Sequence, residues 1–455
     1  MDVDRVLVVT LGGCKGRRKF HDQKKVTRGR SLDLATPAAR SPPNDPELGH
    51  ARMAETHKWA ATREEGLARL ADFAPLAGAD YAKRRNFDLG PGQHKNVSQL
   101  SPYIRHRLIR EDEVLLETLK HHSPASAEKF IQEVYWRTYW KGWLEMRPAV
   151  WGAYWSELAL AWDQVQTQSG LRQEWEAACN GETGIDCFDA WAKELVETGY
   201  LHNHSRMWFA SIWIFTLRLP WALGADFFMR HLLDGDPASN TLSWRWVGGL
   251  QTVGKTYLAR TSNISKFTEG RFHPQYQLAS HADPLQGAPH PPRMDAPEGD
   301  RFDPEKRTAF LLHEDDLTPD WLFEQGLKPV ATATISTAKR LSILQPAPHV
   351  LSFKSAAIDD CLSRLADKTG PVTKGLESAD QIAHWAASVG AEQIVTSYPP
   401  VGPVADILRG KWDIPMARVL HDFDRDAWPH AKAGFFKFKE KIPHLLGNIR
   451  NLRLI

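Results

Sequence analysis

The sequence of 455 residues is poor in cysteine and contains no CxxC pair. Its four cysteines are far apart in the chain: Cys14, Cys179, Cys187 and Cys361. This spacing argues against a zinc or iron–sulfur site held by thiolates and against a disulfide scaffold. We therefore expect no metal site and a reducing compartment, the cytoplasm.

Long apolar runs and an excess of charge of one sign are also absent. No apolar run approaches the length of about 18 residues that a membrane span needs, and Asp2–Arg5 lacks the basic start of a signal peptide. We expect no membrane span and no export. With 57 basic and 55 acidic residues the net charge is +2, so any nucleic-acid contact must be a local patch.

Tryptophan is abundant instead. Of 18 tryptophans, 14 fall between Trp59 and Trp246. One interpretation is a large helical core, because an indole buries a large area and needs only one partner for its N–H. The other is that some indoles carry electrons or stack on a flat ligand.

The length predicts two or three domains, and the composition divides the chain into four parts. Residues 1–55 read as a basic, proline-rich leader that is disordered, residues 56–280 as helical, residues 281–304 as a proline-rich linker and residues 305–455 as α/β. A nucleic-acid-binding arm is the other reading of the leader. The fold class expected is mainly α, with an all-helical domain before a smaller, doubly wound, Rossmann-like sheet.

Two helical features and six strands are expected within these parts. The helices are Val114–Met146, broken at Ser123-Pro124, and Leu201–Leu219. The strands are 308–313, 329–334, 350–353, 371–374, 393–396 and 416–420. A ligand crevice would lie at the carboxyl ends of these strands, although neither GxGxxG nor GxxxxGK[ST] follows any of them.

Three segments of the helical part indicate a binding site. In Asn96–Tyr103, Ser101 before Pro102 reads as a helix N-cap, where free N–H groups favour an anion. In Thr198–Met207, an arginine lies on the same face as an amide and a thioether, and a buried arginine needs an acceptor. In Asp234–Trp246, Asp236 reads as a helix start, which leaves Asp234 to pair with Arg206.

These segments resemble the FAD-binding helical domain of DNA photolyases and cryptochromes. The similarity covers about residues 80–260 and also rests on Tyr81, Arg84–Phe87, Gln132–Arg137 and Thr183-Gly184. It implies a bent FAD in a bowl of helices. The FAD contacts that it implies are Tyr81, Ser98, Gln99, Leu100, Ser101, Arg137, Asn203, Arg206, Asp234, Asp236 and Asn240.

The resemblance also implies a reaction. Asn240 would face flavin N5, and light would drive an electron into a cyclobutane pyrimidine dimer flipped out of UV-damaged DNA. The residues implied around the dimer are Glu133, Trp136, Asn203, Met207 and Trp246. The (6-4) branch of the family carries histidines where this chain has Asn203 and Met207, so the chain looks like the cyclobutane-dimer type.

The family's tryptophan relay is matched only in part. Trp244 and Trp221 match its two inner members, whereas Gln168 occupies the third position and Trp162 or Trp175 could substitute for it. Gln99, Asp186 and Trp191–Lys193 also depart from the family pattern, which suggests an atypical branch.

The order of domains departs most, because family members place the α/β antenna domain first. We therefore interpret the chain as a permuted photolyase in which Thr308–Leu317 opens the antenna domain, with a possible second chromophore of unknown identity. We expect a deoxyribodipyrimidine photolyase, a carbon–carbon lyase, and favour a monomer. A cryptochrome-like blue-light photoreceptor without repair activity remains the alternative.

Local cationic clusters could contact DNA phosphates, and two histidine pairs could suggest a metal. The cationic residues are Arg105, Arg107, Arg110, Lys255, Arg260, Lys266 and Arg271, although such a cluster taken alone is more often a solvated helix face. The pairs His121-His122 and His202 with His204 lack the i, i+4 spacing of a helical zinc site, so we read them as non-metal.

Overall fold

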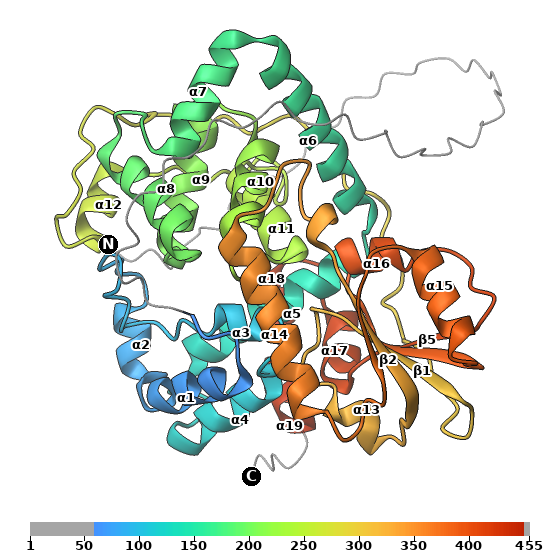
Figure 1. Cartoon of the computed structure of the whole chain (residues 1–455). Helices are drawn as coiled ribbons and strands as arrows, with labels where there is room; N and C mark the ends of the chain where they lie inside the picture. Colours follow the sequence, from blue (N-terminus) through green and yellow to red (C-terminus); the bar gives the residue numbers. More distant parts are fainter. Residues whose placement is uncertain (1–58, 450–455) are drawn as a thin grey trace, which may run out of the picture. The chain divides into compact units, whose positions relative to one another are not determined.

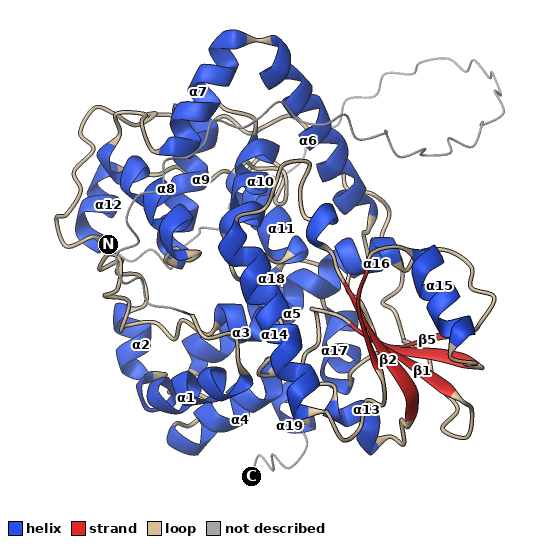
Figure 2. Ribbon diagram, viewed as in Figure 1, coloured by secondary structure: helices blue, strands red, loops and turns tan. Residues whose placement is uncertain are grey.

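The computed structural model describes residues 59–449. In this part of the chain the helices come first and a parallel sheet follows (Figure 1 and Figure 2). Both belong to one compact unit, Glu55–Ile455. The expected leader, residues 1–55, lies outside the described residues, as does Cys14.

The first region is helical, as the apolar periodicity predicts. Its helices are α1 Arg63–Phe73, α2 Ala79–Arg84, α3 Ser101–Arg105, α4 Glu111–His121, α5 Glu128–Glu145, α6 Ala149–Thr167, α7 Ser169–Asn180, α8 Asp186–Thr198, α9 Asn203–Ser211, α10 Trp221–His231, α11 Pro237–Val247 and α12 Thr261–Phe267. A short 3-10 helix, η1 Ala74–Leu76, follows α1, and a π-helix, η2 Ile212–Thr216, continues α9. The predicted break at Ser123-Pro124 is confirmed, since it separates α4 from α5.

Local signals set the ends of the helices that carry the expected site. Asp236 caps α11, because its side chain accepts from the backbone N–H of Ser239 at 2.8 Å. Pro237 fits the first turn of that helix, where no N–H partner is needed. Gly199 ends α8 at φ +69°, and a Cβ there would lie 2.7 Å from Leu233. The turn from α8 into α9 therefore requires glycine.

The second region is a five-stranded, wholly parallel sheet in the order β3-β2-β1-β4-β5. Its strands are β1 Thr308–Leu312, β2 Pro329–Ile335, β3 Val372–Leu376, β4 Gln393–Ser397 and β5 Met416–Val419. The helices of this region are α13 Asp320–Glu324, α14 Pro348–Arg364, α15 Ala379–Ser388, α16 Pro403–Ile407, α17 Asp422–Ala427, α18 Phe435–Lys439 and α19 Ile442–Asn448, with 3-10 helices η3 Ala338–Arg340 and η4 Trp428–His430. The chain crosses from one side of β1 to the other, as the predicted doubly wound sheet requires.

One expected strand is wrong. Residues 350–353 lie in helix α14. Pro348 stands in the first turn, and Val350, Phe353, Ala357 and Cys361 are buried at helical spacing. The short apolar run Val350–Phe353 resembles a strand only when its longer helical context is ignored.

The carboxyl ends of β1 and β4, where the strand order reverses, face the helical region. Leu317 after β1 donates its N–H to the carbonyl of His106 at 3.0 Å. After β4, Tyr398 donates to Glu145 Oε2 at 2.9 Å and the Val401 N–H donates to Glu145 Oε1 at 2.6 Å. The crevice expected at these strand ends is therefore covered by α3 and α5. Binding of a second chromophore remains a prediction without named residues.

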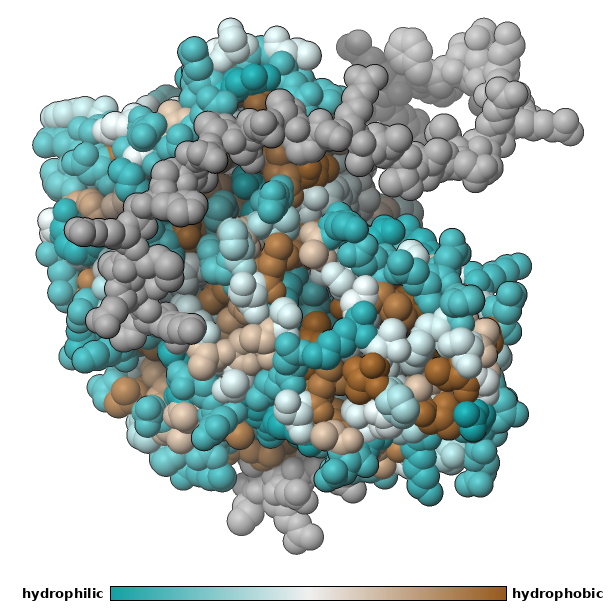
Figure 3. Space-filling view, viewed as in Figure 1, coloured by the Kyte–Doolittle hydropathy of each residue, from teal (hydrophilic) through white to brown (hydrophobic). Residues whose placement is uncertain are grey.

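The chain between α12 and β1 contains neither helix nor strand. It runs beside β5, because the Asp300 N–H donates to the Arg418 carbonyl at 2.8 Å and the Arg418 N–H donates to Asp300 Oδ2 at 2.9 Å. Figure 3 shows one face of the molecule. Where grey atoms do not hide this face, its hydrophobic residues form separate patches among hydrophilic ones. Among residues 59–449, no helix combines the length and the apolar character that crossing a bilayer demands.

Candidate functional site

Helix α5 carries a row of four charged side chains at a spacing of four residues: Glu133, Arg137, Lys141 and Glu145. Residues four apart lie on one face of a helix, one turn above each other. The row therefore places two cationic side chains between two acidic ones along the helix. Its middle lies against the loop between α10 and α11, which supplies Asp234 and Asp236.

Asp236 is surrounded by cations. Arg105 Nε, Arg137 Nη2 and Lys141 Nζ each lie 3.8 Å from Asp236 Oδ2. Burial alone would raise the pKa of Asp236, but these cations, Arg137 foremost, hold it well below its ordinary value. The carboxylate is therefore charged and leaves a net positive charge around it.

The predicted pair between Asp234 and Arg206 is confirmed. The two guanidinium nitrogens of Arg206 donate to the two carboxylate oxygens of Asp234 at 2.9 and 2.8 Å. Burial would raise the pKa of Asp234, but Arg206 and the Ser101 hydroxyl lower it below its ordinary value. A bidentate pair of this kind fixes α9 against the α10–α11 loop.

Some buried donors beside Asp236 have no hydrogen-bond partner among the described residues. They are Nε and Nη2 of Arg137 and the hydroxyl of Ser239. Burial lowers the pKa of Arg137, which Asp236 opposes. Because an unpaired buried donor is costly, such groups mark a place where a ligand can supply acceptors. A phosphate fits these donors, so the residues present suit a dinucleotide.

The segment Ser98–Ser101 adopts an unusual backbone. Gln99 has φ +51°, in the left-handed region that residues other than glycine rarely adopt. The Ser98 hydroxyl accepts from the Leu100 N–H at 3.4 Å. The expectation that Ser101 is the N-cap is wrong, because Ser101 is the first residue of α3 and Leu100 precedes it in a helical conformation. The Ser101 side chain is instead turned toward Asp234.

Glu133 lies next to Tyr81 and Arg85. Arg85 Nη1 donates to Glu133 Oε1, and 31% of the Glu133 side chain is exposed. Burial raises the pKa of Glu133, although Arg85 opposes the shift. Burial also raises the pKa of Tyr81, which stays a neutral phenol. The acid is thus held by one cation at the edge of the buried region.

Asn240 and Trp244 lie on α11 against α10. Asn240 Nδ2 donates to the Ala225 carbonyl at 2.8 Å, which fixes the orientation of the amide. A Cβ on Gly224 would lie 2.3 Å from the Trp244 ring, so only glycine lets the indole approach α10 so closely. The Trp244 Nε1–H is buried without a partner among the described residues.

The residues expected around the dimer are more exposed. Asn203 is exposed, and Trp136, Met207 and Trp246 are half-buried. Trp246 stacks on Tyr257 with ring centroids 5.7 Å apart. Trp136 stacks on Phe435 of α18 with centroids 3.6 Å apart and an interplanar angle of 12°. One face of Trp136 is therefore already covered.

Trp221 of α10 contacts the ring of Tyr154, which lies on α6. Their centroids lie 5.8 Å apart, while the Trp221 Nε1–H donates to Glu157 Oε2 at 2.6 Å. Trp162 and Trp175 contact each other at 5.3 Å. Among the described residues, neither ring contacts Trp221. The geometry therefore assigns neither of them as the third relay member.

Two of the arginines expected to meet DNA are buried. Arg105 and Arg107 are 1% and 6% exposed. Arg105 pairs with Asp315 after β1, and Arg107 Nη2 donates to Asp424 of α17 at 2.5 Å. The prediction is therefore wrong for both, because the sheet region supplies acids that a helical domain alone would lack. Lys255, Arg260 and Lys266 are exposed, whereas Arg110 pairs with Asp112 and Arg271 with Asp88.

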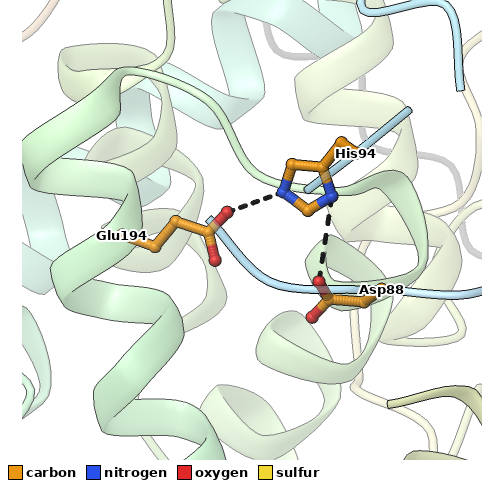
Figure 4. Close-up of side chains that lie close together, drawn as sticks. All are labelled: Asp88, His94 and Glu194. Carbon is orange, nitrogen blue, oxygen red and sulfur yellow. Dashed lines mark hydrogen bonds and ion pairs between the residues drawn. The ribbon is translucent and has the colours of Figure 1, made fainter. Parts of the chain in front are cut away.

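Asp88, His94 and Glu194 form a buried cluster of side chains that could ligate a metal (Figure 4). His94 Nε2 contacts Glu194 at 2.9 Å, while His94 Nδ1 lies 3.9 Å from Asp88 Oδ1. Asp88 also accepts from Gly90, Trp191, Ser205 and Arg271 at 2.8–2.9 Å. With these donors the carboxylate is already satisfied, so the cluster ties residues 88–94 to α8.

Three residues of this region were not predicted from the sequence: Lys141, Glu145 and Phe435. Lys141 and Glu145 continue the four-residue spacing of Glu133 and Arg137, so helical periodicity could have found them. Phe435 carries no comparable signal, because its contact with Trp136 joins positions 299 residues apart in the numbering.

Comparison with known proteins agrees with this geometry. Residues 130–279 match the family model described as "FAD binding domain of DNA photolyase". Two similar curated proteins are deoxyribodipyrimidine photo-lyases. That of Vibrio cholerae is 29% identical over 46% of this chain and 44% of its own length. That of Escherichia coli K12 is 27% identical over 56% and 55%. The chain thus spans about half the length of the curated relatives it matches.

Solved structures give a weaker likeness. A class III photolyase from Agrobacterium tumefaciens has a TM-score of 0.38 and 26% identity, over 46% of this chain and 43% of its own. A cryptochrome from Synechocystis has a TM-score of 0.37 and 23% identity, over the same shares. The matched sequence covers α5 to α12, which carry Arg137, Arg206, Asp234 and Asp236. Residues 130–279 are thus similar to the FAD-binding domain of DNA photolyases.

Proposed function

We propose that this protein is a FAD-dependent enzyme that uses light to split cyclobutane pyrimidine dimers in DNA, with the antenna-like α/β region after the FAD-binding region. The observation that carries the proposal is the position of Arg137, one turn of α5 from Glu133, with two buried donors that find no hydrogen-bond acceptor among residues 59–449. A cofactor anion and a DNA base would thus bind along the same helix. The names of the curated relatives support the same reaction.

Residues around Asp236 would hold the cofactor. Arg137 and Ser239 offer free donors to its phosphates, and Gln99 to Ser101 supply a strained segment nearby. Because Nδ2 of Asn240 donates to Ala225, its amide oxygen would be the atom available to a protonated flavin N5. When bound and reduced, FAD supplies the light-absorbing one-electron donor.

Glu133 would bind the dimer rather than the flavin. Its carboxyl group, which Arg85 holds at the edge of the buried region, would hydrogen-bond to a flipped pyrimidine. Trp136, Met207 and Trp246 would line the space for the flipped bases, and Asn203 is exposed for contact with them. Trp244, whose indole packs against α10, and Trp221, whose indole packs against α6, would carry electrons toward the cofactor.

The decisive experiment identifies the cofactor of the purified full chain, reduces it, and illuminates it with single- and double-stranded DNA that contains dimers. Loss of dimers only in light is the expected result. A flavin without repair would favour the photoreceptor, for which one observation speaks, the covering of one face of Trp136 by Phe435. Failure to bind FAD would contradict both.

Substitution of Glu133 tests its assigned role. Glu133→Ala should slow repair about tenfold or more with little loss of cofactor, since removing a hydrogen bond to a charged partner costs about 1.5–3 kcal/mol. Glu117→Ala is the matched control, because Glu117 also pairs with one cation and is 27% exposed. Equal repair by wild type and Glu133→Ala would remove Glu133 from the reaction.

A further inference from the structure

The C-terminal segment 432–439 runs along α5 in the opposite direction. Arg147, just after α5, donates to the Lys432 carbonyl at 3.0 Å, and Tyr139 donates to the Ala433 carbonyl at 2.8 Å. Phe435 stacks on Trp136, and Lys439 pairs with Glu128 at 2.8 Å. The segment therefore follows α5 from its last turn to its first.

Close packing fixes this arrangement. A Cβ on Gly142 would lie 2.8 Å from the Trp428 ring, so the glycine lets η4 lie directly on α5. Phe438 is buried and packs against Tyr135 and Tyr139. Because Phe435 and Phe438 are both held by α5, the backbone of α18 that carries Phe436 is fixed next to α5.

Phe436 is 80% exposed, whereas Phe435 and Phe438, the residues of α18 that pack on α5, are buried. Lysines surround it in the sequence at positions 432, 437, 439 and 441, with Glu440 as the one acid between them. The side chain of Lys437 is 73% exposed, and it pairs with Glu440 at 2.9 Å. Half-buried Trp136 and Trp140 continue the aromatic surface on α5.

We propose that this strip, made of Trp136, Trp140, Phe436, Lys432 and Lys437, binds the DNA strand beside the dimer, with Phe436 stacking on an unpaired base. The inference rests on the proposed function. An exposed ring, Phe436, beside exposed lysines suits a single strand, because every base has a face to stack and every nucleotide has a negative phosphate. Arg105 and Arg107 are buried in ion pairs and cannot reach DNA, so exposed lysines such as Lys432 and Lys437 are candidates for phosphate contacts beside Lys255, Arg260 and Lys266.

The test measures binding in the dark, by fluorescence anisotropy, of the full flavin-loaded chain to DNA that contains one dimer. Phe436→Ala should weaken binding at least fivefold, as expected for loss of one base–aromatic stack. Lys437→Ala should weaken it about twofold to fivefold and reduce its dependence on salt by about one phosphate contact. Flavin content should be unchanged in both variants.

Two controls are matched to these variants. Leu160→Ala removes a side chain that is 65% exposed on α6, and Lys339→Ala removes a lysine that is 79% exposed and pairs with Glu377 at 2.7 Å. Both should bind DNA as the wild type does.

The outcomes separate the inference from the proposed function. If the wild type binds no DNA, the proposed function fails. If the wild type binds and Phe436→Ala and Lys437→Ala bind equally well, the strip is not a DNA contact and the inference is overturned. A change of oligomeric state in Phe436→Ala, with unchanged DNA binding, would instead make the strip an interface between copies.

Discussion

Two buried charged clusters of this protein have similar composition but differ in how completely their hydrogen bonds are satisfied. At the junction with the sheet, Lys354 donates to Glu314 at 2.6 Å and Thr337 donates to its other oxygen at 2.6 Å. Around Asp236, by contrast, Arg137 keeps two buried donors without a partner in the described part of the chain. Among the described residues, Glu314, Lys354 and Thr337 leave no buried side-chain atom without a partner, whereas Arg137 leaves two.

The difference teaches which buried charges hold the fold and which receive a ligand. Burying a charged side chain costs desolvation free energy, which an ion-pair partner offsets. Removing the partner leaves that cost uncompensated. A cation that lacks part of its hydrogen bonding is a weak contributor to stability and a strong site for an anion. The following variants test this division.

The largest effect is expected at the junction. Lys354→Met removes the partner of Glu314, whose side chain is 3% exposed, and should lower the free energy of unfolding by about 3 kcal/mol. Urea denaturation measures it, and the folded protein should keep its flavin. The exposed pair of Lys374 with Asp359 gives the control, because Lys374→Met should change stability by less than about 0.5 kcal/mol. Equal stability of both variants would break the comparison.

The second effect concerns ligand binding. Arg137→Met should leave Asp236 with Arg105 and Lys141 and cost little stability. It should weaken FAD binding tenfold to a hundredfold, as loss of charge-assisted hydrogen bonds implies. Titration of the flavin-free chain with FAD measures the change. Unaltered FAD affinity, or a loss of stability as large as that of Lys354→Met, would contradict the assignment.

The third effect is a dependence of stability on pH at Glu145, the last member of the α5 row. Burial raises its pKa from 4.5 to about 7, against the hydrogen bonds from Val401 and Tyr398. The folded state therefore binds the proton more tightly than the unfolded state does. Stability should fall as pH rises from about 4.5 to about 7 and stay level above that, by at most about 3 kcal/mol.

Urea denaturation at about pH 5 and about pH 8 measures this fall. Glu145→Gln should be less sensitive to pH across that interval, because an amide does not titrate there. The same fall in the variant and the wild type would assign the dependence to another group.

Much of the fold was accessible from local patterns. Ser123-Pro124 predicted the break between α4 and α5, and Asp236-Pro237 predicted the start of α11. The pairing of Asp234 with Arg206 followed from the need of a buried arginine for an acceptor. These features depend on neighbours in sequence or on a single charge, which explains why they could be predicted.

The remaining features depend on contacts between distant segments. The burial of Arg105 and Arg107 follows from Asp315 and Asp424, which lie 210 and 317 residues away. No local property of the arginines distinguishes a surface cluster from a buried pair of this kind. For the same reason the covering of Trp136 by Phe435, and the closure of the crevice at the strand ends, could not be read from the sequence.

The contact between Gly142 and Trp428 has a consequence for how such a protein can change over generations. Any side chain larger than hydrogen at position 142 would push the C-terminal segment away from α5. It would then uncover Trp136 and displace Phe436 at once. We therefore expect the segment 432–439 and helix α5 to change together, because a larger residue at position 142 fits only if the segment moves.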